Sequence, residues 1–171
     1  MTKPARKKKP TARRKETPPV KVRASRVHGR GVFSTRPIRK GARIIEYTGQ
    51  RVAWDDAPND PATAHTFNFG LHNGLVISPD IGGNDARWIN HSCRPNCEAI
   101  EDERDRVFIY ALRKIEPGEE LFYDYKLEID EPRTPVIEKE YACLCGAESC
   151  RGTLLKPERK KRSRKKRDAS R

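Results

Sequence analysis

Hydrophobic residues in this chain fall in short runs, and turn residues separate the runs. Runs of this kind, rich in β-branched and aromatic side chains, are typical of strands. We therefore expect a mainly β fold (α+β, with few short helices) that is built of several small sheets. The predicted strands lie at 42–49 (ARIIEYTG), 106–115 (RVFIYALRKI) and 121–125 (LFYDY).

Three other stretches predict a hairpin and two short helices. In 71–78 (LHNGLVIS) an Asn-Gly pair separates two apolar runs, which favours a type I′ turn. The stretch 84–90 (NDARWIN) is predicted to be helical, with Asn84 as the N-cap, because an asparagine side chain can accept from a free backbone amide. A weaker helix, interrupted by a proline, is expected at 52–60 (VAWDDAPND).

Charge divides the chain into a centre and two basic arms. The net charge is +13, and residues 1–26 hold eleven Lys/Arg against one acid, while residues 156–171 hold ten against two. The centre is therefore mildly acidic. The arms have too few apolar residues to form a core, so we expect them to be disordered. Such runs bind polyanions, which predicts a nucleic-acid partner; a solubilising or targeting tail is the alternative.

Length and hydropathy bound the class of protein. A chain of 171 residues is long enough for one domain with a core. It has no apolar signal segment and no stretch approaching ~18 apolar residues, so we expect an intracellular protein without a membrane span. Structural disulfides are rare in that setting, and the five cysteines therefore suggest metal binding or catalysis.

Three cysteines share one motif, C-x-C-x4-C, at 143–150 (CLCGAESC). Three thiols this close can bind one tetrahedral zinc ion, which needs a fourth ligand. The octapeptide 90–97 (NHSCRPNC) offers Cys93 or Cys97. Buried or surface thiols are the alternative, and a nucleophilic cysteine has only weak support from His91 two residues before Cys93. The predicted ligands in the motif are Cys143, Cys145 and Cys150.

Two further segments are less specific. The stretch 28–33 (HGRGVF) has two glycines that let backbone approach a ligand closely, or that simply form a turn. Residues 126–142 are polar, contain two prolines and are interpreted as a linker.

Five motifs, taken in order, resemble the SET-domain protein-lysine methyltransferases that carry a post-SET cysteine motif. They are HGRGVF (28–33), EYTG (46–49), GNDARWINHSCRPNC (83–97), ALRKIEPGEELFYDY (111–125) and CLCGAESCRGTLL (143–155). The resemblance implies a SET-domain fold with a knot-like C-terminal threading and a zinc-stapled post-SET segment. The implied organisation is a basic arm (1–22), a SET catalytic domain (23–128), a linker (129–142), a post-SET zinc motif (143–155) and a basic tail (156–171).

The resemblance also implies which cofactor and metal ion the protein binds, and through which residues. It implies S-adenosyl-L-methionine as the cofactor and a structural zinc ion, with Cys93 as the fourth ligand and Cys97 as a small buried side chain. At His65 many relatives have an aromatic hydroxyl instead. The implied cofactor-binding residues are His28, Gly29, Arg30, Gly31, His65, Asn90, His91, Tyr125, Leu144 and Leu154.

The implied chemistry is methyl transfer to a lysine amine. The amine must lose a proton before it attacks, and a narrow aromatic channel beside a positive charge favours that loss. Tyr125 is the predicted catalytic tyrosine, and Tyr47 is predicted to line the channel and hydrogen-bond the amine. The resemblance places Tyr123 at the family's phenylalanine/tyrosine switch position, where its hydroxyl is expected to limit the product to one or two methyl groups; alternatively, Tyr123 simply packs.

The expected substrate is a basic protein, histone-like or otherwise associated with nucleic acid. Acidic groups near 55–60 and in 101–105 (EDERD) would attract it, or they are solvated loops. The arms would tether the enzyme at chromatin or a nucleoid, in a nucleus or a bacterial cytoplasm, or would themselves be methylated. The alternatives are a catalytically inactive, zinc-stapled adaptor on nucleic acid and a DNA-compacting protein. Oligomeric state is left open.

Overall fold

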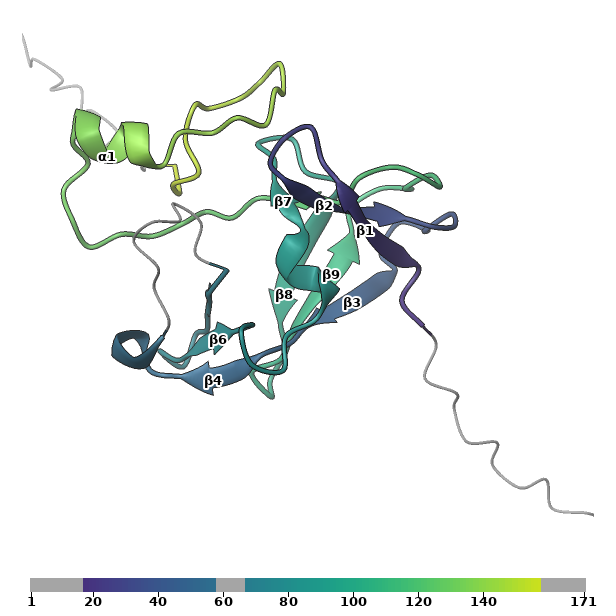
Figure 1. Cartoon of the computed structure of the whole chain (residues 1–171), viewed down its shortest axis with the longest axis horizontal. Coiled ribbons are helices and arrows are strands. Elements are labelled where there is room, and N and C mark those ends of the chain that lie inside the picture. Colours follow the sequence, from purple (N-terminus) through teal and green to yellow (C-terminus); the bar gives the residue numbers. More distant parts are fainter. Residues whose placement is uncertain (1–16, 58–66, 158–171) are drawn as a thin grey trace, which may run out of the picture.

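A computed structural model of the chain describes residues 17–57 and 67–157 (Figure 1). In these ranges the fold consists of short strands with very few helices, as the sequence predicts. One three-stranded antiparallel sheet has the order β3-β9-β8, and another has the order β4-β6-β5. Their strands are β3 (Arg43–Tyr47), β9 (Val107–Ala111) and β8 (Cys97–Glu101), and β4 (Gln50–Val52), β6 (Val76–Ser78) and β5 (Phe69–Gly70).

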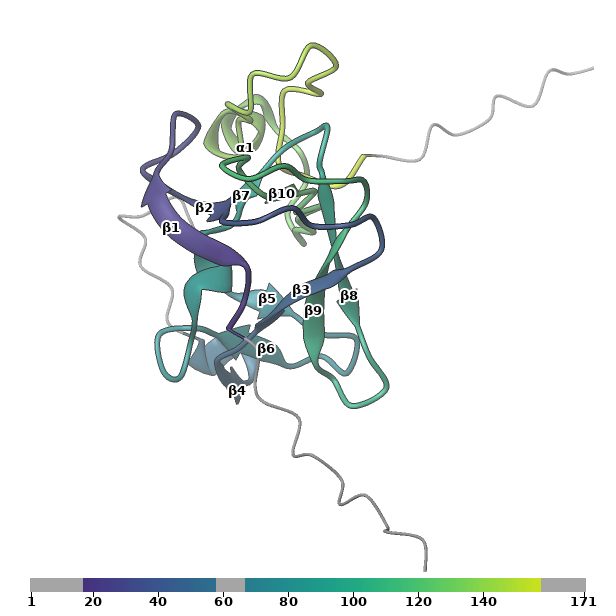
Figure 2. The same ribbon diagram turned by 90° about the vertical axis from the view of Figure 1, so that its right-hand side faces the viewer.

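Two smaller sheets complete the described part. Strands β1 (Val20–Ala24) and β2 (Arg30–Ser34) form an antiparallel hairpin. Strand β7 (Asn90–His91) pairs in parallel with β10 (Phe122–Tyr123), although 30 residues separate them in the chain. Figure 2 shows β7 and β10 side by side, with the C-terminal segment (yellow) above them.

The helical elements are short. Helix η2 (Asp85–Trp88) begins at the predicted N-cap, because the Asn84 side chain accepts a hydrogen bond from the Ala86 amide at 3.1 Å. Within the predicted helix at 52–60, only η1 (Trp54–Asp56) forms, and residues 58–60 lie outside the described ranges. Helix α1 (Pro135–Glu140) lies inside the predicted linker, where Thr134 caps it and a proline occupies its first turn.

The type I′ turn predicted in the hairpin is wrong. A type I′ turn needs positive φ at both central residues, but Asp105 and Lys126 are the only non-glycine residues with positive φ in the described ranges. Strand β5 ends at Gly70, so the connection is the longer loop 71–75, closed by the Leu71 amide donating to the Leu75 carbonyl at 2.8 Å. Asn73 supports the loop through its side chain, which accepts from the Leu75 amide at 2.9 Å.

Asn96 holds the two central motifs together. Its side chain is 2% exposed, donates to the Glu120 carbonyl at 2.7 Å and accepts from the Phe122 amide at 2.8 Å. These bonds fix β10 beside β7 and so bring the NHSC motif to the LFYDY motif. The knot-like threading stays an expectation of the resemblance.

The core surrounds these strands. Cys97, on β8, is fully buried in it, as expected for a small side chain without a ligand role. Two of the predicted site tyrosines, Tyr47 and Tyr123, belong to the same cluster, so the site is built on the packed core. Within the described ranges no helix has the length and apolar character needed to cross a bilayer.

Candidate active site and metal centre

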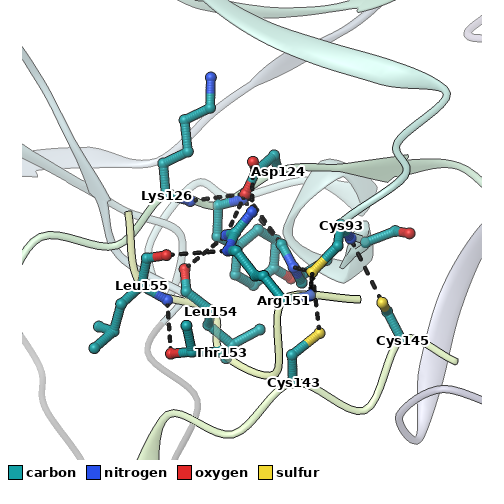
Figure 3. Close-up of polar contacts among 12 residues, drawn as sticks. Cys93, Asp124, Lys126, Cys143, Cys145, Arg151, Thr153, Leu154 and Leu155 are labelled. Carbon is teal, nitrogen blue, oxygen red and sulfur yellow. Dashed lines mark hydrogen bonds and ion pairs between the residues drawn. The ribbon is translucent and has the colours of Figure 1, made fainter. Parts of the chain in front are cut away.

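Four cysteine thiols meet where the C-terminal segment contacts the NHSC motif; Figure 3 shows three of them, Cys93, Cys143 and Cys145. The Sγ atoms of Cys93, Cys143, Cys145 and Cys150 all lie within 4.8 Å of one another. Cys93 Sγ is 3.7 Å from Cys143 Sγ and 3.8 Å from Cys150 Sγ. Zinc–sulfur bonds of about 2.3 Å in a tetrahedron place the sulfurs about 3.8 Å apart. The cluster therefore fits one tetrahedral ion.

Backbone amides point at the sulfurs of this cluster. The amide of Arg151 donates to Cys93 Sγ at 3.4 Å, and that of Gly152 donates to Cys150 Sγ at 3.4 Å. Such donors stabilise thiolates. Burial, by contrast, raises the pKa of the Cys93 and Cys143 thiols, so a cation is needed for all four groups to ionise together.

Arg151 ties the cysteine cluster to the segment that carries the tyrosines. Its guanidinium donates two hydrogen bonds to the Asp124 carboxylate, at 2.8 and 2.6 Å, and one from Nε to the Leu155 carbonyl at 3.1 Å (Figure 3). Burial would raise the pKa of Asp124, but the bonds from Arg151 outweigh it and hold that pKa below its usual range. The pair is thus ionised and half-buried.

Replacing Arg151 with lysine is expected to loosen the cluster, because lysine keeps the charge but cannot make the paired bond. We expect metal affinity, measured by chelator competition, to fall about 10-fold, as for other groups that orient metal ligands. Arg106→Lys is the matched control, since Arg106 makes a similar bond to Asp102 at 2.9 and 2.6 Å. Equal metal affinity in the two variants would contradict this role of Arg151.

His91 connects the cluster with Tyr125. The ring is 4% exposed, and its Nδ1 accepts from the Tyr125 amide at 3.1 Å while Nε2 lies 3.4 Å from Cys93 Sγ. Burial lowers the pKa of His91 to about 4, so the ring is neutral near pH 7. Because Nδ1 accepts, the proton is on Nε2 and points to Cys93. The histidine thereby positions both the sulfur and the tyrosine backbone.

Asn90 fixes the loop that precedes β2. Its side-chain amide donates to the Arg30 carbonyl at 2.8 Å and to Glu120 Oε1 at 2.9 Å. Gly29 in this loop has φ +38°, which favours glycine, and a Cβ on Gly31 would lie 2.1 Å from Glu120 Oε1. A side chain at the second glycine of HGRGVF would therefore displace the Glu120 carboxylate from its hydrogen bond with Asn90.

Two cavities meet at Tyr125. The first has an apolar wall and contains the NHSC asparagine and histidine, and the second contains the tyrosine cluster. Phe67, Tyr125 and Leu127 line both. The first is lined by Val27, His28, Phe67, Asn90, His91, Tyr125, Leu127, Ala142, Cys143, Leu144, Cys145 and Leu154. Lining residues of the second include Tyr47, Trp54, Phe69, Leu71, Tyr123, Glu128, Asp130 and Tyr141.

The structure brings together most of the residues that the resemblance named. His28, Asn90, His91, Tyr125, Leu144 and Leu154 line the first cavity, and Tyr47, Tyr123 and Tyr125 line the second. Gly29, Arg30 and Gly31 lie next to the first cavity's lining rather than in it, and the Arg30 guanidinium packs over Trp88 at 4.7 Å. A cofactor contact by these three stays a prediction. His65 lies outside the described residues.

The tyrosines form a close aromatic wall. The rings of Tyr123 and Tyr125 lie 4.8 Å apart, and Phe69 lies 5.4 Å from Tyr47 and 6.4 Å from Tyr123. Tyr125 donates its hydroxyl proton to the Ile89 carbonyl at 2.8 Å, and Tyr47 donates to the Phe67 carbonyl. Burial raises the pKa of all three tyrosines well above the usual value. They are neutral phenols at pH 7.

Sequence reasoning missed several residues of the site. Phe67 and Leu127 line both cavities, and the Asp124–Arg151 pair joins the two motifs. Of these residues, the sequence offered a clue only to the Asp124–Arg151 ion pair. Asp124 lies between the two tyrosines of YDY, and Arg151 directly follows the last cysteine. Charged residues placed between apolar or metal-ligating neighbours are candidates for pairing.

Comparison with known proteins decides the family. Residues 29–126, more than half of the chain, match the SET domain family. This chain belongs to the SET domain family. Its cysteine cluster fits the post-SET motif that accompanies some SET domains.

Relatives of this SET domain include three proteins named as histone-lysine N-methyltransferases. Human SETD1B is 36% identical over 140 residues (76% of this chain), and trr of Drosophila melanogaster is 37% identical over 135 residues (74%). A Candida albicans protein named "Histone-lysine N-methyltransferase, H3 lysine-4 specific" is 37% identical over 150 residues (82%). The chain spans only 7%, 5% and 14% of the lengths of these relatives.

Proposed function

We propose that this SET domain transfers methyl groups from S-adenosyl-L-methionine to the side-chain amine of lysine in a basic, histone-like protein. The observation that carries the proposal is the position of Tyr125, whose ring borders both an apolar cavity beside the NHSC motif and a second cavity walled by tyrosines. A donor and an acceptor bound in these cavities would meet at this residue. The names of the relatives support the same activity.

The first cavity suits the proposed cofactor. Apolar side chains such as Val27, Leu127 and Leu154 would contact the adenine ring, and His28 and Asn90 offer polar groups. Leu144 lines this cavity and is 75% exposed, so a bound cofactor would cover part of its side chain. When bound, S-adenosyl-L-methionine supplies a methyl group on a positively charged sulfur, which is already electrophilic.

The second cavity would prepare the lysine amine. Lysine in water has a pKa near ~10.4 and is mostly protonated at pH 7. An aromatic wall formed by Tyr47, Phe69 and Tyr123 desolvates the ammonium and lowers that pKa, so the neutral amine enters the site. Because the tyrosines themselves have raised pKa values and stay neutral, the proton leaves to water rather than to a tyrosine.

Tyr125 would act as a neutral acceptor. The Tyr125 hydroxyl donates its proton to the Ile89 carbonyl, so the lone pairs of the hydroxyl oxygen are available toward the cavities. These lone pairs favour the positive charge that is shared by the amine and the methyl carbon during transfer. The rigid placement of the ring, held through its backbone amide by His91, orients the two reactants.

We also propose that Cys93, Cys143, Cys145 and Cys150 hold a structural zinc ion, which fastens residues 143–155 over the first cavity. The sulfur spacing and the amide donors support this assignment. Chromatin association is proposed from the relatives' names. Nucleic-acid binding by the arms is proposed from charge alone, because nearly all of their basic residues lie outside the described ranges.

Transfer of a labelled methyl group to core histones tests the proposal. With metal-loaded protein, the label should appear in methyl-lysine after hydrolysis of the histones. Label in methyl-arginine, or no label in a reaction where the cofactor binds, would contradict it.

Tyr123 is expected to limit the number of methyl groups. Its ring lies 4.8 Å from that of Tyr125 and its side chain is 9% exposed, so the hydroxyl occupies space beside the amine. Tyr123→Phe should shift the main product from mono- or dimethyl-lysine toward trimethyl-lysine, with kcat changed less than about 10-fold. Mass spectrometry of a peptide substrate measures this shift. An unchanged product distribution would mean that Tyr123 only packs.

A further inference from the structure

We propose that the β1–β2 hairpin and the segment 35–43 that follows it form a face that binds the phosphate backbone of double-stranded DNA. This cationic face consists of six exposed residues: Lys21, Arg23, Arg36, Arg39, Lys40 and Arg43. All six belong to the described fold, so the face adds a structured surface to the nucleic-acid binding proposed for the arms. Binding at this face does not depend on methyl transfer.

Charge is distributed unevenly over the described chain. Residues 17–45 hold eight Lys/Arg and no Asp or Glu, whereas residues 46–57 and 67–157 hold twelve Lys/Arg against twenty acids. Seven of those twelve form ion pairs with a carboxylate. None of the eight in 17–45 forms an ion pair with another described residue. Unneutralised cations gathered on one part of a fold attract a polyanion.

Strand alternation directs the cations of the hairpin away from the core. Val20 and Val22 on β1 pack against the core cluster. Successive side chains of a strand point to opposite faces, so Lys21 and Arg23 face outward. Both are exposed.

Backbone hydrogen bonds hold the segment after β2 on the same side of the fold. The Thr35 amide donates to the Pro19 carbonyl at 2.9 Å, which fixes this segment beside the start of the hairpin. The Ala42 amide donates to the Arg39 carbonyl at 3.1 Å, so the chain turns there and leaves Arg39 and Lys40 exposed. Figure 2 looks onto this side, with β1, β2 and the following segment toward the viewer.

Aromatic rings hold two of the arginines in place. The Arg23 guanidinium lies over the Phe33 ring at 5.8 Å, and that of Arg43 lies over the Phe108 ring at 4.7 Å. Such stacking fixes a guanidinium without using its N–H donors. Neither side chain hydrogen-bonds to another described residue. The donors are therefore available for phosphate oxygens, which a guanidinium binds through paired hydrogen bonds.

Acidic residues of the adjoining segment 113–120 do not cancel this charge. Glu116 and Glu119 are paired with Lys114 and Arg113. The carboxylate of Glu120 turns inward, where it accepts from the NHSC asparagine at 2.9 Å. The loop beside the face is thus close to neutral.

Two more acids lie on the sheet that Arg43 enters. Glu46 is three residues further along β3, about 10 Å away, and the register places Glu98 two strands from Arg43, beyond Tyr110. Even when both of these and Glu120 are counted in full, three of the six positive charges on the face have no counterpart. The face therefore stays positive.

The cationic face is separate from the two cavities. None of its six residues lines either cavity, and Figure 1 places β1 on the opposite side of the fold from α1, which leads into the lining residues 141–145. DNA on this face would leave both cavities open to a protein substrate. Among polyanions, DNA is the one that accompanies the basic, histone-like substrate proposed above, and this step alone rests on the proposed function.

The test compares two variants of the full chain that each lose three positive charges. K21Q/R36Q/R39Q removes half of the face, and R51Q/R104Q/K139Q removes three other exposed residues that have no ion pair. The arms are unchanged in both, and equal unfolding temperatures show that both fold.

We expect K21Q/R36Q/R39Q to bind a random-sequence duplex about 10-fold or more weakly than the wild type. The slope of log K against log salt should become shallower by about 3, because each lost phosphate contact removes about 0.9. The control should change the slope by less than about 1.

Acetylation footprinting of the wild-type chain separates the face from the arms. In the DNA complex, Lys21 and Lys40 should be protected from acetic anhydride, whereas Lys139 on α1 should react as in the free protein. Vesicles of phosphatidylserine serve as a second anionic probe.

The outcomes distinguish this inference from the other proposals. Unprotected Lys21 and Lys40 in the complex, or equal DNA affinity in the two variants, would overturn the face and leave binding by the arms intact. Protection by vesicles but not by the duplex would overturn DNA as the partner. A chain that binds DNA through this face but methylates no histone would contradict the proposed function instead.

Discussion

Tyr125→Phe is expected to lower kcat for methyl transfer by about 100-fold or more, with a small change in cofactor affinity. Loss of one polar group that acts on developing charge commonly costs 10²–10³ in kcat, about 3–4 kcal/mol. The Tyr125 hydroxyl is such a group, because it lies at the junction of the two cavities with its proton held by Ile89. Single-turnover rates and calorimetric binding of S-adenosyl-L-methionine measure the two effects separately.

The control must lose a tyrosine hydroxyl that lies away from the junction of the two cavities. Tyr141→Phe is suitable, since Tyr141 also lines the second cavity but takes no part in the ring contacts that Tyr123 makes with Tyr125 and Phe69. We expect its kcat to stay within about threefold of wild type. Equal losses in the two variants would mean that the Tyr125 hydroxyl has no special part in the reaction.

Cys93→Ser is expected to remove the metal and abolish measurable methyl transfer. Cys93 is the only described ligand that lies outside residues 143–150, so its loss detaches the C-terminal segment from the NHSC motif. Structural zinc sites contribute on the order of 10 kcal/mol to the structure they hold. Without that contribution Leu144 and Leu154 no longer line the first cavity, and cofactor binding should be lost together with activity.

Metal content, from elemental analysis of the purified protein, measures this effect directly. We expect one zinc per wild-type chain and none in Cys93→Ser. Cys97→Ala is the control, because Cys97 is a buried core residue outside the cluster, and it should retain the zinc at reduced stability. One zinc per chain in Cys93→Ser, with normal activity, would refute the metal assignment.

The sequence predicted those elements of the fold that depend on residues close together in the chain. The strand 42–49 and the cap of η2 at Asn84 were found because hydrophobic pattern and capping act over a few residues. The hairpin turn was wrongly predicted because Asn73 does not adopt a positive φ; its side chain supports a longer loop instead, in which only Gly74 has a positive φ. Helix α1 was missed because the two prolines of residues 126–142 suggested a linker, although one of them, Pro135, occupies the first turn of the helix, where proline is tolerated.

The residues of the site also divide into those that the sequence indicated and those that depend on contacts between distant segments. Motif spacing brought out the three cysteines of 143–150, and the family resemblance added Cys93, Asn90, His91 and the tyrosines. The structure gathers these residues at or beside two adjoining cavities. The contacts that hold them in place are long-range: Asn96 to Glu120, Asn90 to Arg30 and Arg151 to Asp124. Nothing in local periodicity specifies such pairs, because they depend on how distant segments cross.

Intact-mass analysis of core histones, incubated with S-adenosyl-L-methionine and the metal-loaded protein, tests the central claim most directly. We predict additions of one or two methyl masses on a histone lysine with the wild-type chain, and none over the same time with Tyr125→Phe. Methyl addition that persists at the wild-type rate in Tyr125→Phe would contradict the assigned site. A wild-type protein that binds the cofactor yet methylates neither histones nor any other basic protein would contradict the enzyme itself.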